Sequence, residues 1–248
     1  MSDFYQQYQQ GNHQKVYDEL LTLGEQVYEP AVYNDALSVM RAMMQRVHAN
    51  IELLLPRLQA LRFQFRKGGF WEGAPREKQA QLEREYPTFL PPTTETLEQV
   101  TTLEHLTGPL PLSLKCFYEE VGSVNLIGLF PSNERNYGCV LDPLCIYSVE
   151  VALQMVTSMK QGGFWEEEPL LILAGDQFHK YGYSGGGTYN VRLPSKAVDA
   201  LLLDEPHQTT LVNYLRICMQ WGGFPGFAQE CRLSQDEFTY LTRDLVPF

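Results

Sequence analysis

Apolar residues recur at helical spacing between residues 34 and 68. After an N-cap signal at Asn34-Asp35, the apolar positions alternate at intervals of three and four residues. This pattern predicts a long helix with a heptad-like seam that packs against another helix. Pro56 lies off the seam and predicts a kink or break near Leu55, and Gly68-Gly69 predicts the end of the helix. The seam residues are Leu37, Met40, Met44, Val47, Ile51, Leu54, Leu58, Leu61 and Phe65.

The 37–65 seam requires a packing partner. An earlier helix over residues 14–27 carries Val16, Leu20, Leu23 and Val27 at helical spacing. We therefore predict a helical hairpin inside one chain, in which the two apolar faces cover each other. A homodimer that buries the seam between two copies is the alternative.

The pattern changes beyond residue 90. Prolines 87, 91 and 92 bracket a linker over residues 87–94, preceded by a short charged helix over 76–86. The sequence therefore divides into a helical region, residues 1–90, and a second domain, residues 91–248. In the second domain, helical spacing predicts helices over 94–106, 113–121, 149–159, 209–221 and 235–245. Short β-type runs predict strands over 124–130, 138–141, 170–174, 188–193 and 200–203.

These elements define the expected fold class. Helices come first, and a mainly antiparallel sheet follows, with one helix inserted among its strands and others after them. This order is typical of an α+β protein, in which a helical hairpin region precedes a sheet packed with helices. Hydrophobic residues make up 44% of the 248 residues and aromatic residues 12%, which is sufficient for a packed core.

The composition argues against a membrane protein and against secretion. No run approaches the roughly 20 apolar residues that cross a bilayer. The first seven residues contain no basic or apolar segment of a secretory signal, so we expect a cytoplasmic protein. The five cysteines are scattered and odd in number, which predicts free buried thiols in a reducing compartment and no metal site. No phosphate-binding or cofactor motif is present, and we expect no cofactor.

The negative charge is concentrated in the second domain. Residues 1–90 carry 10 Lys and Arg against 11 Asp and Glu, whereas residues 91–248 carry 9 against 19. The net charge of the second domain is therefore −10, out of −11 for the whole chain. Such a field repels nucleic acid and anionic lipid and attracts basic proteins. Simple solubility is the alternative explanation.

One catalytic pattern needs testing. The segment Gly182-Tyr183-Ser184-Gly185-Gly186 matches the G-x-S-x-G motif of α/β-hydrolases, with Asp199 or Asp204 and then His207 downstream. A nucleophile elbow leads into a helix, whereas the residues after this motif alternate like a strand. Asp204 and His207 are also too close in sequence to come from separate strand ends. We therefore predict a non-enzymatic protein, and a serine hydrolase acting through Ser184 is the least favoured alternative.

Residues 94–227 resemble the SUKH superfamily, which contains bacterial toxin-immunity proteins and a fungal regulator of cell-wall synthesis. Several short features carry the resemblance in order. Leu110-Pro111 opens a helix that carries Phe117, and Gly122 ends that helix before a strand. Gly186 and Tyr189 then match the turn into a later strand, after an apolar strand over 170–175. The segments over 97–106 and 210–215 resemble the leading and closing helices of the family.

The resemblance implies a non-catalytic domain that binds a protein partner, often a toxin. A basic toxin fits the negative charge of the domain, because charge complementarity increases the rate and specificity of association. The alternative is a dimeric scaffold or regulatory protein that acts in signalling or cell-wall control. The residues expected to contact the partner are Trp165, Glu166, Glu167, Glu168, Asp176, Asp204 and Glu205.

Overall fold

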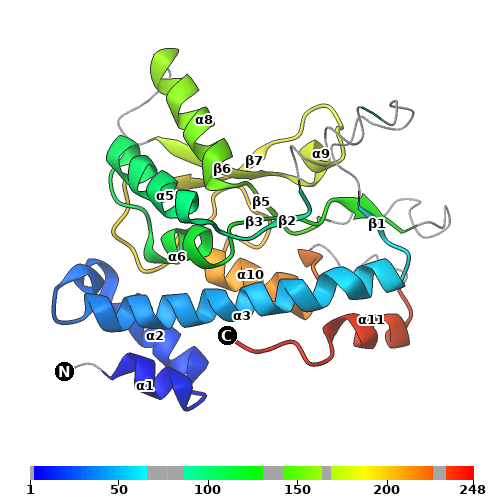
Figure 1. The fold of residues 1–248 in the computed structure, drawn as a ribbon, viewed down its shortest axis with the longest axis horizontal. Helices are drawn as coiled ribbons and strands as arrows, with labels where there is room; N and C mark the ends of the chain where they lie inside the picture. Colours follow the sequence, from blue (N-terminus) through cyan, green and yellow to red (C-terminus); the bar gives the residue numbers. More distant parts are fainter. Residues whose placement is uncertain (1–2, 66–76, 78–86, 131–141, 164–168, 226–232) are drawn as a thin grey trace.

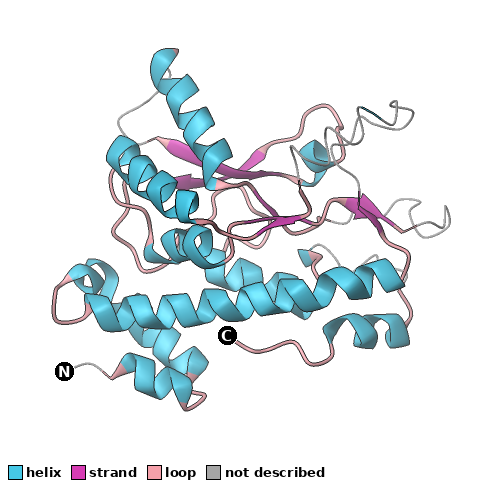
Figure 2. Ribbon diagram, viewed as in Figure 1, coloured by secondary structure: helices cyan, strands magenta, loops and turns pink. Residues whose placement is uncertain are grey.

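We analysed a computed structural model of the chain. The structure describes residues 3–65, 77, 87–130, 142–163, 169–225 and 233–248. It is an α+β protein in which helices pack around small antiparallel sheets, as the sequence predicts (Figures 1 and 2). The predicted 76–86 helix, with the exception of residue 77, the 138–141 strand and Gly68-Gly69 lie outside the described residues.

The N-terminal region is helical throughout. The sequence predicted one helix over residues 14–27, and the structure has a helix followed by a 3₁₀ turn. An additional helix precedes them, and its N-terminus is capped from a distance: the Asp35 carboxylate accepts hydrogen bonds from the backbone N–H groups of Phe4 and Tyr5, at 2.7 and 3.2 Å. Asp35 therefore caps this first helix and not the long helix to which Asp35 itself belongs. The elements are α1 (Phe4–Gln9), α2 (His13–Leu23), η1 (Gly24–Tyr28) and α3 (Tyr33–Ala60).

Helix α3 differs from expectation at its C-terminal end. It continues through Pro56 without a break, because burial of Leu54 and Leu58 on either side offsets the cost of a proline inside a helix. The helix ends at Ala60, well before the glycine pair. Arg62 adopts a left-handed φ of 62°, and the N–H of Phe63 donates to the carbonyl of Leu58 at 2.9 Å, the geometry of a Schellman helix end.

The seam of α3 is covered within one chain. Leu37, Leu61 and Phe65 are half-buried, whereas the other six seam residues are fully buried. Val39, Met43 and Asn50 are buried as well, so the covered surface is wider than a heptad stripe. Helix α3 packs most closely against α6 (Leu112–Glu120), α1 and α11 (Gln235–Thr242), so its main packing partners differ from the 14–27 helix of the predicted hairpin.

The second region follows the predicted helices closely. The helix predicted over 235–245 ends three residues earlier, and one short helix, α9, had no sequence signal. The remaining helices are α5 (Thr94–Thr107), α8 (Val149–Gln161), α9 (Gln177–Lys180) and α10 (Leu211–Gln220). The strands are β1 (Gln64–Phe65), β2 (Phe89–Leu90), β3 (Ser123–Asn125), β4 (Gly128–Leu129), β5 (Cys145–Ile146), β6 (Leu170–Gly175) and β7 (Thr188–Arg192).

All the strand pairs among the described residues are antiparallel. They form three small sheets in the orders β1-β4, β2-β3-β5 and β6-β7. The predicted 124–130 strand is divided between β3 and β4. The predicted 200–203 strand makes only single bridges, from Leu203 to Asn190 and from Leu201 to Thr210. Because β1 pairs with β4, the two regions of the chain share a sheet.

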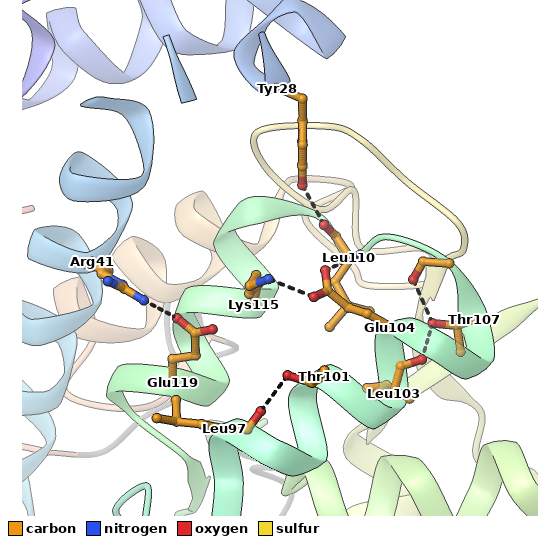
Figure 3. Close-up of polar contacts among 11 residues, drawn as sticks. Tyr28, Arg41, Leu97, Thr101, Leu103, Glu104, Thr107, Leu110, Lys115 and Glu119 are labelled. Carbon is orange, nitrogen blue, oxygen red and sulfur yellow. Dashed lines mark hydrogen bonds and ion pairs between the residues drawn. The ribbon is translucent and has the colours of Figure 1, made fainter. Parts of the chain in front are cut away.

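The two regions also share a hydrophobic core and polar contacts. In Figure 1, α5, α6 and α8 lie above the long helix α3, and α1, α2 and α11 lie below it. Figure 3 shows two of the polar contacts: the Tyr28 hydroxyl donates to the Leu110 carbonyl at 2.7 Å, and Arg41 pairs with Glu119 at 2.9 Å. One cluster of buried residues includes side chains from both regions. Within the described residues, no helix combines the length and apolar character needed to cross a membrane.

Candidate functional site

The connection between β6 and β7 exposes two aromatic side chains. Phe178, on α9, is 45% exposed, and Tyr183, just after this helix, is 59% exposed. Their ring centroids lie 6.5 Å apart with the rings nearly perpendicular, a favourable edge-to-face geometry. Two adjacent large aromatic residues on a surface of this kind mark a candidate interaction site.

Asp176 fixes the shape of this connection. One carboxylate oxygen accepts the N–H of His179 at 2.8 Å and so caps α9, and the other accepts the N–H of Gly187 at 2.7 Å. The backbone N–H of Asp176 donates to the carbonyl of Gly187 as well. A Cβ atom at Gly186 would lie 2.5 Å from the backbone nitrogen of His179, so glycine is required there. The aromatic pair is therefore held on a closed loop.

A buried ion pair anchors the same loop from beneath. Lys180, the last residue of α9, is almost fully buried and pairs with the equally buried Asp142. The Tyr189 hydroxyl donates to the second oxygen of Asp142 at 2.9 Å, and the Lys180 ammonium lies 4.9 Å from the centroid of the Tyr189 ring. Burial, reinforced by the negative charge of Asp142, raises the pKa of Tyr189 far above its usual range, so this phenol stays a hydrogen-bond donor.

The turn after residue 203 lies beside the start of β7. Asp204 is exposed and accepts a hydrogen bond from the Asn190 side chain at 3.2 Å. Glu205 is buried, and its two oxygens contact the backbone nitrogen and the ring of His207 at 2.8 and 2.6 Å. The fold therefore brings Asp176, Asp204 and Glu205 to one end of the β6-β7 sheet, with Glu205 inside and Asp204 at the surface.

We call the surface residues of this cluster the β6–β7 platform. Its members are Asp176, Phe178, Tyr183 and Asp204. Sequence reasoning identified the two carboxylates but missed the aromatic pair. The available signal was the presence of both aromatic residues in the polar, glycine-rich connection over residues 176–187, with no apolar periodicity to bury either one.

The other predicted contact residues, Trp165 and Glu166 to Glu168, lie outside the described residues. Pro169, which follows them, lies at the start of β6, where its carbonyl accepts the N–H of Leu193. Asp176 follows the other end of this six-residue strand. A strand of this length spans about 20 Å.

The residues that carry the family resemblance lie in the core or at the ends of helices and strands. Leu110 and Phe117 are fully buried, and Pro111 is the N-cap residue of α6. Gly122 has a left-handed φ of 86°, and a Cβ there would lie 2.1 Å from the carbonyl oxygen of Leu90. Only glycine permits this approach of β2 to the start of β3.

The proposed hydrolase residues do not form a nucleophile elbow. Ser184 lies in an exposed turn, and the chain then enters strand β7 instead of a helix. Asp199 is buried elsewhere, where its carboxylate accepts hydrogen bonds from the Tyr17 hydroxyl at 2.7 Å and the backbone of Val212. The ring of His207 contacts Glu205, as described above.

Other reactive groups are buried or dispersed. Cys116, Cys145 and Cys218 are free and buried, and burial raises the pKa of the Cys145 thiol to about 11, which disfavours the thiolate. Among the residues that the structure describes, no group of three or more His, Cys, Asp or Glu side chains is arranged to hold a metal ion. The β6–β7 platform therefore remains the candidate site, because its aromatic pair is exposed whereas these thiols are buried.

Comparison with known proteins identifies no relative. No protein-family model, curated protein or solved structure matches the chain. The β6–β7 platform, which combines exposed aromatic rings with acidic side chains, is therefore a candidate site on structural grounds alone.

Proposed function

We propose that this chain is a non-catalytic protein-binding module and that its partner docks on the β6–β7 platform. The observation that carries the proposal is the exposed pair Phe178 and Tyr183 on a loop closed by Asp176 and anchored by Lys180. Binding energy at protein interfaces is concentrated in a few residues, among which aromatic side chains are prominent. A rigid support reduces the conformational entropy that is lost when the partner binds.

The charge of the module points to a basic partner. Residues 91–248 carry a net charge of −10, and Asp204 adds an exposed carboxylate at the platform itself. Long-range attraction accelerates the encounter with a positively charged protein and disfavours acidic competitors. The interaction should weaken as the salt concentration rises, because salt screens exposed charges.

Within this class, we propose an immunity-type protein of the SUKH kind, located in the cytoplasm, that neutralises a basic toxin. The order of elements supports the proposal: Leu110-Pro111 opens α6, Gly122 separates α6 from β3, and Gly186 precedes β7. The 37–65 seam, through which a dimeric scaffold would assemble, is covered within one chain. We therefore favour the immunity role over the scaffold role.

The platform is tested by affinity capture with the full chain as bait. We expect Phe178→Ala combined with Tyr183→Ala to weaken binding of the partner by about 2 kcal/mol, or roughly thirtyfold. The matched control, Leu21→Ala with Leu97→Ala, removes two exposed apolar side chains from other helices and should leave capture unchanged. Thermal unfolding of each variant verifies that the fold is intact. Equal capture by both double variants would exclude the platform as the binding site.

The immunity role is tested separately with the captured proteins. We expect a basic protein that arrests growth when expressed alone and is tolerated when this chain is co-expressed. Protection should fall for the Phe178→Ala, Tyr183→Ala variant and persist for the control variant. If the captured partner is harmless to cells, the proposal of a binding module would stand and the immunity role would be rejected.

A further inference from the structure

Residues 245–248 run alongside α3, on the same side of this helix as α1, α2 and α11 (Figure 1). We call these residues the tail. The Asn50 amide nitrogen donates to the carbonyl of Val246 at 2.9 Å, and the N–H of Val246 donates to the Asn50 oxygen at 2.7 Å. Arg46 donates to the carbonyl of Pro247 at 2.9 Å. These contacts hold the main chain of the tail and do not depend on its side chains.

Helix α10 also contacts the tail, through Arg216. The Nε–H of Arg216 donates to the main-chain oxygen of Phe248 at 2.8 Å, and its guanidinium carbon lies 5.9 Å from the centroid of the Phe248 ring. Phe248 is only 6% exposed, whereas Val246 is 38% exposed. Main-chain hydrogen bonds combined with one buried aromatic anchor are the features by which grooves recognise peptides.

The side chain of Asn50 binds the tail from within the core. It lies in the middle of α3 and is fully buried, and both hydrogen bonds that the structure gives its side chain go to Val246. An amide is a poor choice for a permanent helix–helix contact, because it must find partners when it is buried. Beneath a segment that can leave, an asparagine is favourable, because water can form the hydrogen bonds of its amide once the segment has left.

The groove is larger than the tail that lies in it. A cavity of about 670 Å³ adjoins the tail and is also lined by His13, Arg216 and Met219. The Nη2 atom of Arg216 is buried and has no hydrogen-bond partner within the described part of the chain. Among the described acidic side chains, no carboxylate lies within 4 Å of Arg216. Arg216 therefore offers a hydrogen-bond donor and a positive charge to a larger ligand.

We infer that the groove between α3 and α10 is a peptide-binding site that the tail occupies in cis. Its occupant in trans is a segment of another protein with an aromatic residue at the position of Phe248 and a carboxylate that pairs with Arg216. Asp244, at the junction between α11 and the tail, adopts a left-handed φ of 58°, which disfavours the docked conformation of this hinge. This site is independent of the β6–β7 platform and does not rest on the proposed function.

The inference is tested in the full chain by weakening the tail. Val246→Pro removes the N–H that Asn50 binds, at a position whose side chain is substantially exposed. The probe is a fluorescently labelled peptide with the sequence of residues 243–248, and its binding is followed by anisotropy. We expect the Val246→Pro protein to bind the peptide about tenfold more tightly than the wild type, because the competing tail loses one to two hydrogen bonds. Adding Asn50→Leu should abolish this gain, and adding Gln45→Ala, an exposed change on the same helix, should not.

A second release variant, Phe248→Ala, removes the aromatic anchor and should also increase peptide binding. Thermal unfolding and circular dichroism verify that each variant is folded. Unchanged peptide affinity in both folded release variants would overturn the inference, as would a gain that persists with Asn50→Leu. A wild-type dimer that Asn50→Leu abolishes in sedimentation would assign the groove to the tail of a second copy and would overturn the assignment to another protein.

Discussion

Replacing Lys180 with methionine is expected to destabilise the protein by about 3–5 kcal/mol, because it leaves the buried carboxylate of Asp142 without its cation. Both side chains are almost fully excluded from solvent, and among the described residues Tyr189 is the remaining side-chain donor to Asp142. Chemical denaturation at neutral pH measures the loss directly. Since Lys180 also ends α9, we expect the exposed pair Phe178 and Tyr183 to lose its fixed position in the same variant.

Two further variants identify the cause of this loss. Lys196→Met removes an exposed lysine from the same region and should change the free energy of unfolding by less than about 0.5 kcal/mol. Lys180→Met combined with Asp142→Asn removes the orphaned charge while keeping an acceptor for Tyr189, and it should recover more than half of the lost stability. A Lys180→Met protein within about 1 kcal/mol of the wild type would show that the ion pair is not what secures α9.

The second large effect is expected at Asp199, where alanine should destabilise the protein by about 2–4 kcal/mol. The buried carboxylate accepts hydrogen bonds from the Tyr17 hydroxyl and from the backbone of Ala200 and Val212. Removal of the acceptor leaves buried donors with fewer partners, and each such loss costs about 1–3 kcal/mol. Because Tyr17 belongs to α2, the change also removes one of the contacts that join the N-terminal helices to the second region. Asp18→Ala, an exposed neighbour of Tyr17, is the control.

Asp199 also determines the direction in which the free energy of unfolding changes with pH. Burial raises the pKa of its carboxyl group above the unfolded value of about 3.9. Between the unfolded pKa and the raised folded pKa the native state binds more protons than the unfolded state. The stability that protonated Asp199 contributes is therefore fully present below about pH 4, and it is lost as the pH rises through the pKa of the folded state. Relative to Asp199→Asn, which does not titrate, the wild type should lose stability from about pH 4 upwards in denaturation curves. Parallel pH profiles for the two proteins would contradict the shift.

Most helices of the second region were predictable because their information is local. The apolar spacing of α5, α6, α8 and α10 lies within each helix, and the structure places these helices within a few residues of the prediction. The same is true of β6 and β7, whose apolar runs are bounded by turn residues. Helix α9 was missed because four residues are too few for a periodic signal, and its start depends on Asp176 as the capping residue.

The candidate site was predictable only in part. Asp176 and Asp204 were identified as acidic residues in polar segments, and both belong to the β6–β7 platform. Glu205 has the same sequence character as Asp204, yet its side chain is buried against His207. Alternation along a strand separates the two faces of a sheet, but residues 204–207 form a turn, where the pattern of burial follows no period.

Local spacing was sufficient to establish an α+β protein, its helix-rich beginning, the seam of α3 and the acidic character of the second region. Contacts between distant segments established the rest. Asp35 caps a helix about 30 residues earlier, Tyr17 reaches Asp199, and Asn50 binds a tail segment 196 residues later. A capping, pairing or docking partner can come from any part of the chain, and no short-range pattern specifies which one. The aromatic pair of the platform and the docking of the tail on α3 are therefore products of tertiary packing.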